Sequence, residues 1–229
     1  NDVAPVISSS ATFSAAENQT AIGAVDATDE EGDDLTYSVT GSEISISGTG
    51  ILTFVTAPDY ETKSTYISTV TVSDGDNETT QEITINVTNV NDIAPVISST
   101  ATFSAAENQT AIGAVEASDE EGDDLTYSVT GSEIVISSTG ILSFVSAPDF
   151  ETKSTYTVTV TVSDGVNSVT QDITVNVTNL NDNIPVISSL ASYSADENQT
   201  AIGTVEAADA DGDQLTYSVS GSEIVISST

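Results

Sequence analysis

The sequence predicts an all-β protein in which tandem seven-stranded β-sandwiches of Greek-key type follow one another in a linear rod. The first observation is an internal repeat: "NDVAPVISS" at Asn1 returns as "NDIAPVISS" at Asn91 and as "NDNIPVISS" at Asn181, always 90 residues on. A period this long exceeds the roughly 20–50 residues of solenoid repeats, so each repeat is expected to be a whole domain. The second is strict alternation of apolar and polar residues in short segments.

The alternation is clearest in "LTYSVT" from Leu35 and "STYTVTVTVSDG" from Ser154. Turn signals such as "GTG" at Gly48 and "SDGDN" at Ser73 separate these segments, and no long stretch has the 3.6-residue period of a helix. Short strands at this spacing are typical of a β-sandwich. In the first repeat we expect strands near Val6, Ile22, Leu35, Ile44, Leu52, Val70 and Ile85.

The period predicts three domains, over residues 1–90, 91–180 and 181–229. The third repeat holds counterparts of only the first part of the other two and stops before those of "ILSFV" and "TYTVTVTVSDG". Half a sandwich leaves core residues and strand edges bare. We therefore expect a neighbouring chain or further sequence to complete it.

Charge excludes several classes of partner. The chain has 36 acidic and two basic residues, Lys63 and Lys153, and a net charge of −34. Binding to nucleic acid or to an anionic membrane needs clustered Lys and Arg, so neither is expected. No apolar run approaches the ~20 residues of a membrane span, so membrane insertion is not expected either.

The composition also argues against catalysis. The chain has no Cys and no His, which removes disulfides, thiolate metal sites and the commonest general base. No Ser stands in a recognisable nucleophile motif. Paired carboxylates could in principle cleave glycosides, but here they recur in each repeat, which fits ligands better. We expect no enzymatic activity.

One acidic loop is only partly retained in the third repeat. "DEEGDD" at Asp29 and Asp119 becomes "DADGDQ" at Asp209, which keeps acids at the first, third and fifth places. Closely packed carboxylates repel one another unless a cation binds between them, and Ca²⁺ takes about 6–8 oxygen ligands. The loop is not an EF-hand, because its Gly comes fourth and strands flank it. The sequence therefore predicts a calcium site.

Five motifs, in order, make each repeat resemble a cadherin repeat of the kind found in large bacterial surface proteins. They are the glutamate of "AENQT", the acidic loop, the acids of "DYE" or "DFE", the aspartate of "SDG", and the linkers "NVNDIAP" and "NLNDNIP". Within the first repeat they supply Glu17, Asp29, Glu31, Asp59, Glu61 and Asp74.

The resemblance implies calcium ions at the junctions between repeats. The first junction would use Glu17, Asp59, Glu61, Asn91, Asp92, Asp119, Glu121 and Asp164. The second would use Glu107, Asp149, Glu151, Asn181, Asp182, Asn183, Asp209 and Asp211. Two departures from the family pattern affect the linkers: Asn89 and Asn179 replace its first acid, and Ile93 replaces an Asn that the second linker keeps as Asn183. At that position the family can use a backbone carbonyl, which Ile93 still has.

The resemblance further implies a calcium-rigidified extracellular stalk or adhesion segment of a cell-surface or secreted adhesin. Its partners would be calcium, neighbouring repeats, and copies of itself or a surface ligand. Adhesion by tryptophan strand exchange is unsupported, because the chain has no Trp. Two alternatives stay open: a self-assembling filament in which a neighbour completes the half domain, and, for the acids, a merely solvated surface.

Overall fold

The computed structural model describes residues 3–227 and divides into two compact units, which we treat separately. The first comprises Asn1–Ile93 with Asp119–Asp123, and the second comprises Ala94–Ser118 with Asp124–Thr229. Positions 1–2, in the predicted first domain, and 228–229, in the predicted third domain, lie outside the described residues. No membrane-spanning helix occurs in the part of the chain that the structure describes.

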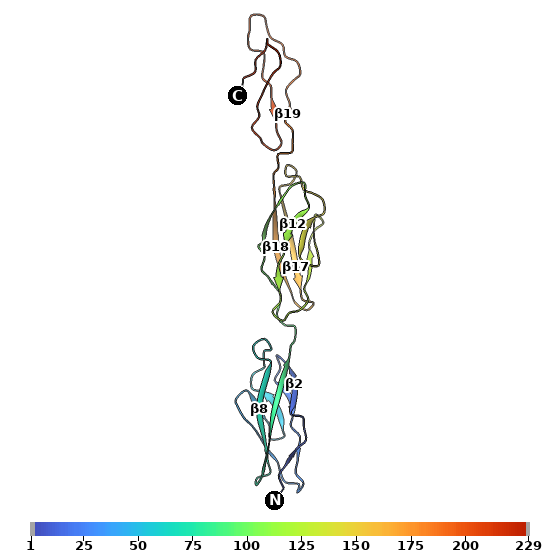
Figure 1. Ribbon diagram of the computed structural model, residues 1–229, viewed down its shortest axis with the longest axis vertical. Helices are drawn as coiled ribbons and strands as arrows, with labels where there is room; N and C mark the ends of the chain where they lie inside the picture. Colours follow the sequence, from blue (N-terminus) through green and yellow to red (C-terminus); the bar gives the residue numbers. More distant parts are fainter. Residues whose placement is uncertain (1–2, 228–229) are drawn as a thin grey trace. The chain divides into compact units, whose positions relative to one another are not determined.

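The first unit is a β-sandwich (Figure 1). A four-stranded sheet in the order β2-β9-β8-β5 packs on a three-stranded sheet in the order β3-β7-β6, and β1 pairs with β4. The strands are β1 (Val6–Ile7), β2 (Thr12–Ala16), β3 (Ala21–Ala24), β4 (Ala27–Thr28), β5 (Thr36–Val39), β6 (Ile44–Ile46), β7 (Ile51–Phe54), β8 (Thr65–Ser73) and β9 (Glu78–Thr88).

The second unit contains the same sandwich, with sheets in the orders β11-β18-β17-β14 and β12-β16-β15, and with β10 paired to β13. Its strands are β10 (Val96–Ile97), β11 (Thr102–Ala106), β12 (Ala111–Ala114), β13 (Ala117–Ser118), β14 (Thr126–Val129), β15 (Ile134–Ile136), β16 (Ile141–Phe144), β17 (Thr155–Ser163) and β18 (Ser168–Thr178). The all-β sandwich class and its tandem repetition are therefore confirmed.

All seven predicted strands of the first repeat form, although the one expected near Leu35 starts at Thr36. Sequence reasoning missed β2 and β4. β2 runs parallel to β9, with Phe13 opposite Ile85, so its hydrogen-bonding partner lies more than 70 residues further along the chain. A strand of small residues that depends on so distant a partner gives only a weak local signal.

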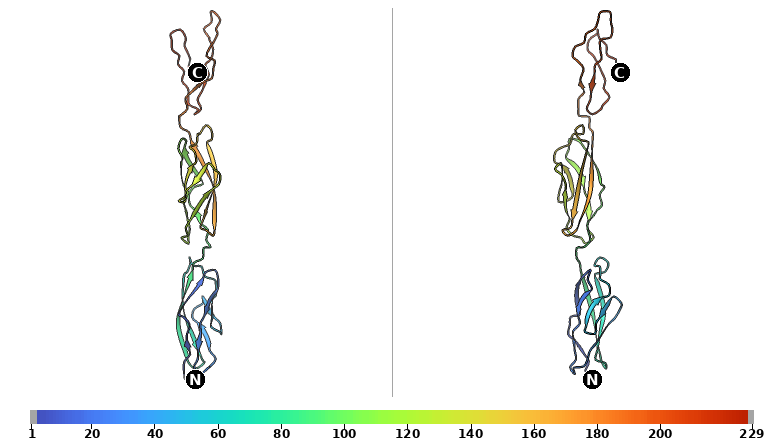
Figure 2. Two further views of the ribbon diagram at one scale, coloured as in Figure 1. Left: turned by 90° about the vertical axis from the view of Figure 1, so that its right-hand side faces the viewer. Right: turned by 180° about the vertical axis from the view of Figure 1, so that it is seen from behind.

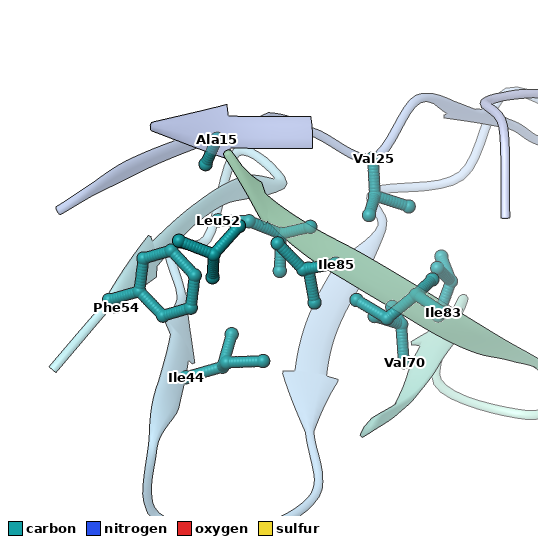
Figure 3. Packing of buried hydrophobic residues seen from close by; sticks show 10 residues of the cluster. Ala15, Val25, Ile44, Leu52, Phe54, Val70, Ile83 and Ile85 are labelled. Carbon is teal, nitrogen blue, oxygen red and sulfur yellow. The ribbon is translucent and has the colours of Figure 1, made fainter. Parts of the chain in front are cut away.

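The core of the first unit comes from the inward faces of both sheets (Figure 3). Leu52 of β7 meets Ile83 and Ile85 of β9, and all three side chains are fully buried. Along β9 the burial alternates, because successive side chains point to opposite faces of a strand. Phe54 and Tyr66 meet edge to face with ring centroids 4.9 Å apart.

Residues 181–227 are largely loop, as the brown and red segment in Figure 2 shows. The strands among the described residues of this segment are β19 (Val186–Ile187) and β20 (Ala207–Ala208). Ile187 is 67% exposed, although its counterpart Ile97 packs against the core of the second sandwich. In the second unit β10, which carries Ile97, contacts β18, whereas no strand equivalent to β18 occurs among residues 181–227.

One glycine in each sandwich is required by a close backbone approach. Gly140 has a φ of 81°, and a Cβ atom there would lie 2.3 Å from the carbonyl oxygen of Val115. The same contact exists between Gly50 and Val25. Val115 also donates a 2.8 Å hydrogen bond to the Gly140 carbonyl, so the two segments cannot separate without losing it.

We expect Gly140→Ala to destabilise the second sandwich more than Gly131→Ala. Gly131 has a φ of 88° with open space around it, so its substitution adds only the left-handed backbone penalty, about 1–2 kcal/mol. Gly140→Ala adds a clash with backbone, which typically costs a further ~1–3 kcal/mol. Urea unfolding followed by circular dichroism measures both; equal losses would contradict the steric argument.

Candidate functional site

A buried glutamate joins three segments of the first unit. Glu17 follows β2 and is only 4% exposed. Its Oε2 accepts a 2.8 Å hydrogen bond from the backbone N–H of Tyr60, and its Oε1 accepts one of 2.7 Å from that of Val90. Hydrogen bonds to the charged form are what make a buried carboxylate tolerable. Glu17 therefore links the end of β2, the loop after β7 and the chain that leaves β9.

The second unit repeats this arrangement. Glu107 is 2% exposed and accepts hydrogen bonds from the N–H groups of Phe150 (2.9 Å) and Leu180 (2.6 Å). Both glutamates were predicted from the "AENQT" motif. In each case the carboxylate accepts a hydrogen bond from two backbone N–H groups, one at each oxygen.

The chain after β9 is also attached to the acidic loop that contains Glu121. Glu121 Oε2 accepts hydrogen bonds from the N–H groups of Asp92 (3.0 Å) and Ile93 (2.8 Å). Its Oε1 atom is buried, and no hydrogen-bond partner for it occurs among the described residues. A buried carboxylate oxygen without a partner is costly, and a bound cation would satisfy it.

These contacts bring four predicted ligands together in the first unit. One carboxylate oxygen from each residue lies within 4.8 Å of the others, in a group we name the first carboxylate cluster: Glu17, Glu61, Asp92 and Glu121. Two oxygens bound to one Ca²⁺ at about 2.4 Å can be at most about 4.8 Å apart. The cluster therefore has the dimensions of a shared cation site.

The second unit holds the equivalent second carboxylate cluster, which is also within 4.8 Å: Glu107, Glu151, Asp182 and Asp211. Asp211 Oδ2 accepts hydrogen bonds from the N–H groups of Asp182 (3.1 Å) and Asn183 (2.8 Å). This matches the role of Glu121 in the first unit. The two clusters thus have the same backbone framework.

Like charges and burial perturb the acids. Partial burial, followed by the negative charges of Glu17 and Glu121, raises the pKa of Glu61. Loss of solvation by surrounding atoms and the charge of Glu107 likewise raise the pKa of Glu151, although its side chain is exposed. Partial burial would also raise the pKa of Asp211, but hydrogen bonds from Asn183 and from the backbone of Asp182 outweigh it and lower that pKa. The ionised form of one carboxylate in each cluster, Glu61 or Glu151, is thus less favourable than it would be in water.

The acidic loops hold their aspartates in a common turn. Asp29 Oδ1 accepts hydrogen bonds from the N–H groups of Glu31 (2.8 Å) and Gly32 (3.0 Å), and Asp119 Oδ1 accepts one from Glu121 (3.0 Å). The Oδ2 atoms of Asp29 and Asp119 are buried without a hydrogen-bond partner among residues 3–227. With Asp209 and Asp211 in the third copy, each loop groups three acids within 4.8 Å.

Several predicted ligands lie outside the two carboxylate clusters. Asp59 and Asp149 use both carboxylate oxygens to cap a turn, accepting hydrogen bonds from the N–H and the hydroxyl group of Thr62 and Thr152. Asp59 still lines, with cluster residues, a pocket of about 340 Å³. The linker residues Asn91 and Asn181 have no carboxylate and so are not cluster members; the Asn181 amide donates to Asp213.

The "SDG" aspartates organise the turn after the long hairpin strand of each unit. Asp74 Oδ1 accepts hydrogen bonds from Asp76 (2.8 Å) and Asn77 (2.7 Å), and Asp164 does the same for Val166 and Asn167. In the first unit Thr36 pairs with Ser73, so the loop of Asp29 and the turn of Asp74 lie at the same end of the sheet. The predicted meeting of Asp164 with Asp119 remains a prediction.

Two sets of residues near the sites were not among the predicted ligands. Asn18 and Asn108 have positive φ angles, 61° and 62°, and their amides donate to Asp92 and Asp182. The repeated "ENQT" was the available signal, but only the fold brings its Asn to the linker. The other set is the fifth acid of each loop, which the third copy retains: Asp33, Asp123 and Asp213.

A family model described as "Bacterial Ig domain" matches residues 1–88 and again residues 91–178. The chain belongs to the bacterial Ig domain family. Among solved structures, these bacterial Ig domains are similar to mouse Cadherin-23 EC22-24, with a TM-score of 0.76 and 22% identity over 91% of this chain and 78% of that one. Protocadherin Gamma B2 extracellular cadherin domains 3-6 give a TM-score of 0.67 and 27% identity over 90% and 55%. The domains thus have a cadherin-like sandwich fold.

Among curated proteins, Chitinase A of Pseudoalteromonas piscicida is 35% identical over 76% of this chain and 22% of its own length. The protocadherin-like wing polarity protein stan of Drosophila melanogaster is 30% identical over 74% of this chain and 6% of its length. The bacterial Ig domains described here therefore span less than a quarter of these relatives.

The raised pKa of Glu61 predicts a pH dependence in ion-free buffer. A carboxyl whose pKa is raised on folding binds its proton more tightly in the native state, so it stabilises the fold at low pH. That stability is lost as the pH rises from the ordinary value of 4.5 through the raised pKa. We expect Glu61→Gln to reduce this decrease of stability with rising pH and to raise the melting temperature at pH 7 in chelator.

The matched control is Glu78→Gln, which removes one negative charge from an exposed position of β9 outside both clusters. This control measures how far the melting temperature rises simply because the strongly acidic chain loses one negative charge. Differential scanning calorimetry between pH 4 and pH 8 measures all three proteins. Equal gains at pH 7 from both substitutions would show that Glu61 is not specifically repelled by its neighbours.

Proposed function

We propose that this chain is a calcium-binding segment of tandem repeats in a cell-surface or secreted protein, in which bound calcium stiffens the connections between repeats. The observation that carries the proposal is the pair of equivalent carboxylate clusters. Each joins a buried glutamate of one sandwich, a linker aspartate and an acid of the following loop. We take the repeats to run over residues 1–90, 91–180 and 181–229.

The donor set supports a hard cation such as calcium over zinc or copper. Carboxylates and backbone carbonyls are hard oxygen ligands, and the chain contains neither His nor Cys, on which zinc and copper sites usually depend. Glu121 Oε1 would supply one ligand, since it is buried and has no hydrogen-bond partner among residues 3–227. Of the predicted ligands outside the clusters, Asp59, Asp149 and the backbone carbonyls of the linkers could complete the coordination.

The mechanism follows from charge. Without a cation, the carboxylates of a cluster repel one another, and a linker between domains acts as a hinge in a strongly negative field. A bound divalent ion would neutralise that field and attract the sandwich, the linker and the next loop to one point. Bending the hinge would then require loss of ligands. Such a segment would act as a spacer or adhesion stalk whose stiffness depends on the surrounding calcium.

An extracellular location is supported by the same chemistry. Extracellular calcium modules bind with Kd values of about 10⁻⁴–10⁻³ M, which match external rather than cytosolic calcium. The cadherin-like fold of the two sandwiches agrees with this location. Adhesion, to copies of the same protein or to a surface ligand, is a further part of the proposal.

A second context is favoured by the match to Chitinase A. The chain covers 22% of that protein, so repeats of this kind also occur within a longer protein named as an enzyme. The segment described here would then act as a non-catalytic spacer. The filament in which neighbouring chains complete the third repeat remains a prediction, and sedimentation as a sharp monomer would exclude it.

We expect calcium to raise the thermal stability of the protein. At about 10 mM, a hundredfold excess over a Kd near 10⁻⁴ M, one site contributes about 2.7 kcal/mol to the free energy of unfolding. Glu121→Gln should remove most of the increase that comes from the first cluster. Thermal melts in calcium and in chelator measure the effect, with Glu30→Gln, an exposed acid of the equivalent loop, as the control. An identical melt in calcium and chelator would reject the site.

Stiffening is tested separately by small-angle X-ray scattering of the same protein. Calcium should narrow the distribution of end-to-end distances, and Glu121→Gln should restore the broad distribution seen in chelator. If calcium binds but the scattering curve does not change, the proposed stiffening is wrong while the calcium site stands. The ion would then stabilise a domain without restraining the hinge.

A further inference from the structure

The two linkers differ in one side chain that faces the acids. In the second unit the amide nitrogen of Asn183 lies 3.1 Å from Glu151 Oε2, 2.9 Å from Asp182 Oδ1 and 3.1 Å from Asp211 Oδ1. One neutral amide thus contacts three of the four members of the second carboxylate cluster. The first linker has Ile93 at the same place, which offers no polar side-chain atom.

The backbone at this place is the same in both units. The N–H of Ile93 donates to Glu121 at 2.8 Å, and the N–H of Asn183 donates to Asp211 at 2.8 Å. Both side chains are half-buried. The backbone carbonyl of either residue could therefore act as a ligand. Ile93 and Asn183 differ only in the side chain, which carries an amide group in Asn183.

An amide N–H₂ group carries two donors and partial positive charge, whereas ionised carboxylates are acceptors only. The Asn183 amide therefore supplies, within the protein, some of the attraction that a cation would supply. A metal ion that binds the same oxygens of Glu151, Asp182 and Asp211 would compete with the amide for their lone pairs. Ile93 offers no such donor to the first cluster, and Glu121 has a buried oxygen without a hydrogen-bond partner among the described residues.

We propose that Asn183 is an internal competitor of calcium: its amide stabilises the ion-free second cluster and weakens calcium binding there, so that the first site fills at lower calcium than the second. This inference rests on the proposed calcium sites and concerns their regulation. Two sites with unequal affinities would let the chain respond to calcium in two steps over a wider concentration range than two equal sites.

The test exchanges the two linker residues. Asn183→Ile gives the second linker the side chain of the first, and Ile93→Asn does the reverse, so each variant controls for the other. The two clusters also differ because Glu121 has a longer side chain than Asp211. Each variant leaves that difference unchanged, so any effect comes from the substituted linker residue. Calorimetric calcium titration and thermal melts in chelator are measured for both variants and the unchanged protein.

We expect Asn183→Ile to tighten calcium binding at the weaker site by about tenfold, the effect of not having to break a charge-assisted hydrogen bond. It should also lower the melting temperature in chelator, which reports the ion-free state independently of binding. Ile93→Asn should weaken the tighter site and raise the melting temperature in chelator.

The opposite result has a definite meaning. If Asn183→Ile weakens calcium binding, the amide has turned its Oδ1 atom toward the ion and acts as a ligand, and the inference is overturned. Unchanged affinities in both variants overturn it as well, while leaving the calcium sites intact. Absence of calcium binding by the unchanged protein would overturn the proposed function together with this inference.

Discussion

The buried carboxylate of Glu17, with its counterpart Glu107, is the interaction on which the rest of the architecture depends. A charged group that is only 4% exposed is tolerated because two backbone N–H groups bind it, one from the loop after β7 and one from the chain after β9. Those hydrogen bonds fix where the linker leaves the sandwich. They thereby bring Asp92 to the same place as Glu61.

Stability and binding are opposed at these clusters. The sandwich core needs no ion, since its inward faces are fully buried aliphatic side chains such as Leu52 and Ile85. The carboxylates add repulsion to that fold, visible as the raised pKa values of Glu61 and Glu151, which follow first from burial and then from neighbouring charge. A bound cation would relieve this repulsion as well as form new interactions.

Tandem duplication makes the comparison between the sites unusually direct. Most cluster residues and their hydrogen bonds are shared between the two units, so the few differences can be assigned to single side chains. Asn183 against Ile93 and Asp211 against Glu121 are the differences at the clusters themselves. Identical frameworks with different side chains can tune affinity without altering the fold, because the backbone donors to the loop acids are kept.

The sequence by itself determined the sandwich class, the 90-residue repetition and the chemistry of the acids, because strand alternation, turn residues and residue type are local properties. It also singled out all eight members of the two carboxylate clusters, through motifs that recur in order. Only the tertiary structure decided that β2 pairs in parallel with β9, that both Asp59 oxygens accept hydrogen bonds from Thr62, that Asn18 reaches Asp92, and that the amide nitrogen of Asn183 contacts the acids. Those outcomes depend on contacts between segments that lie far apart in sequence or on the direction in which a side chain points, and neither is encoded in local pattern.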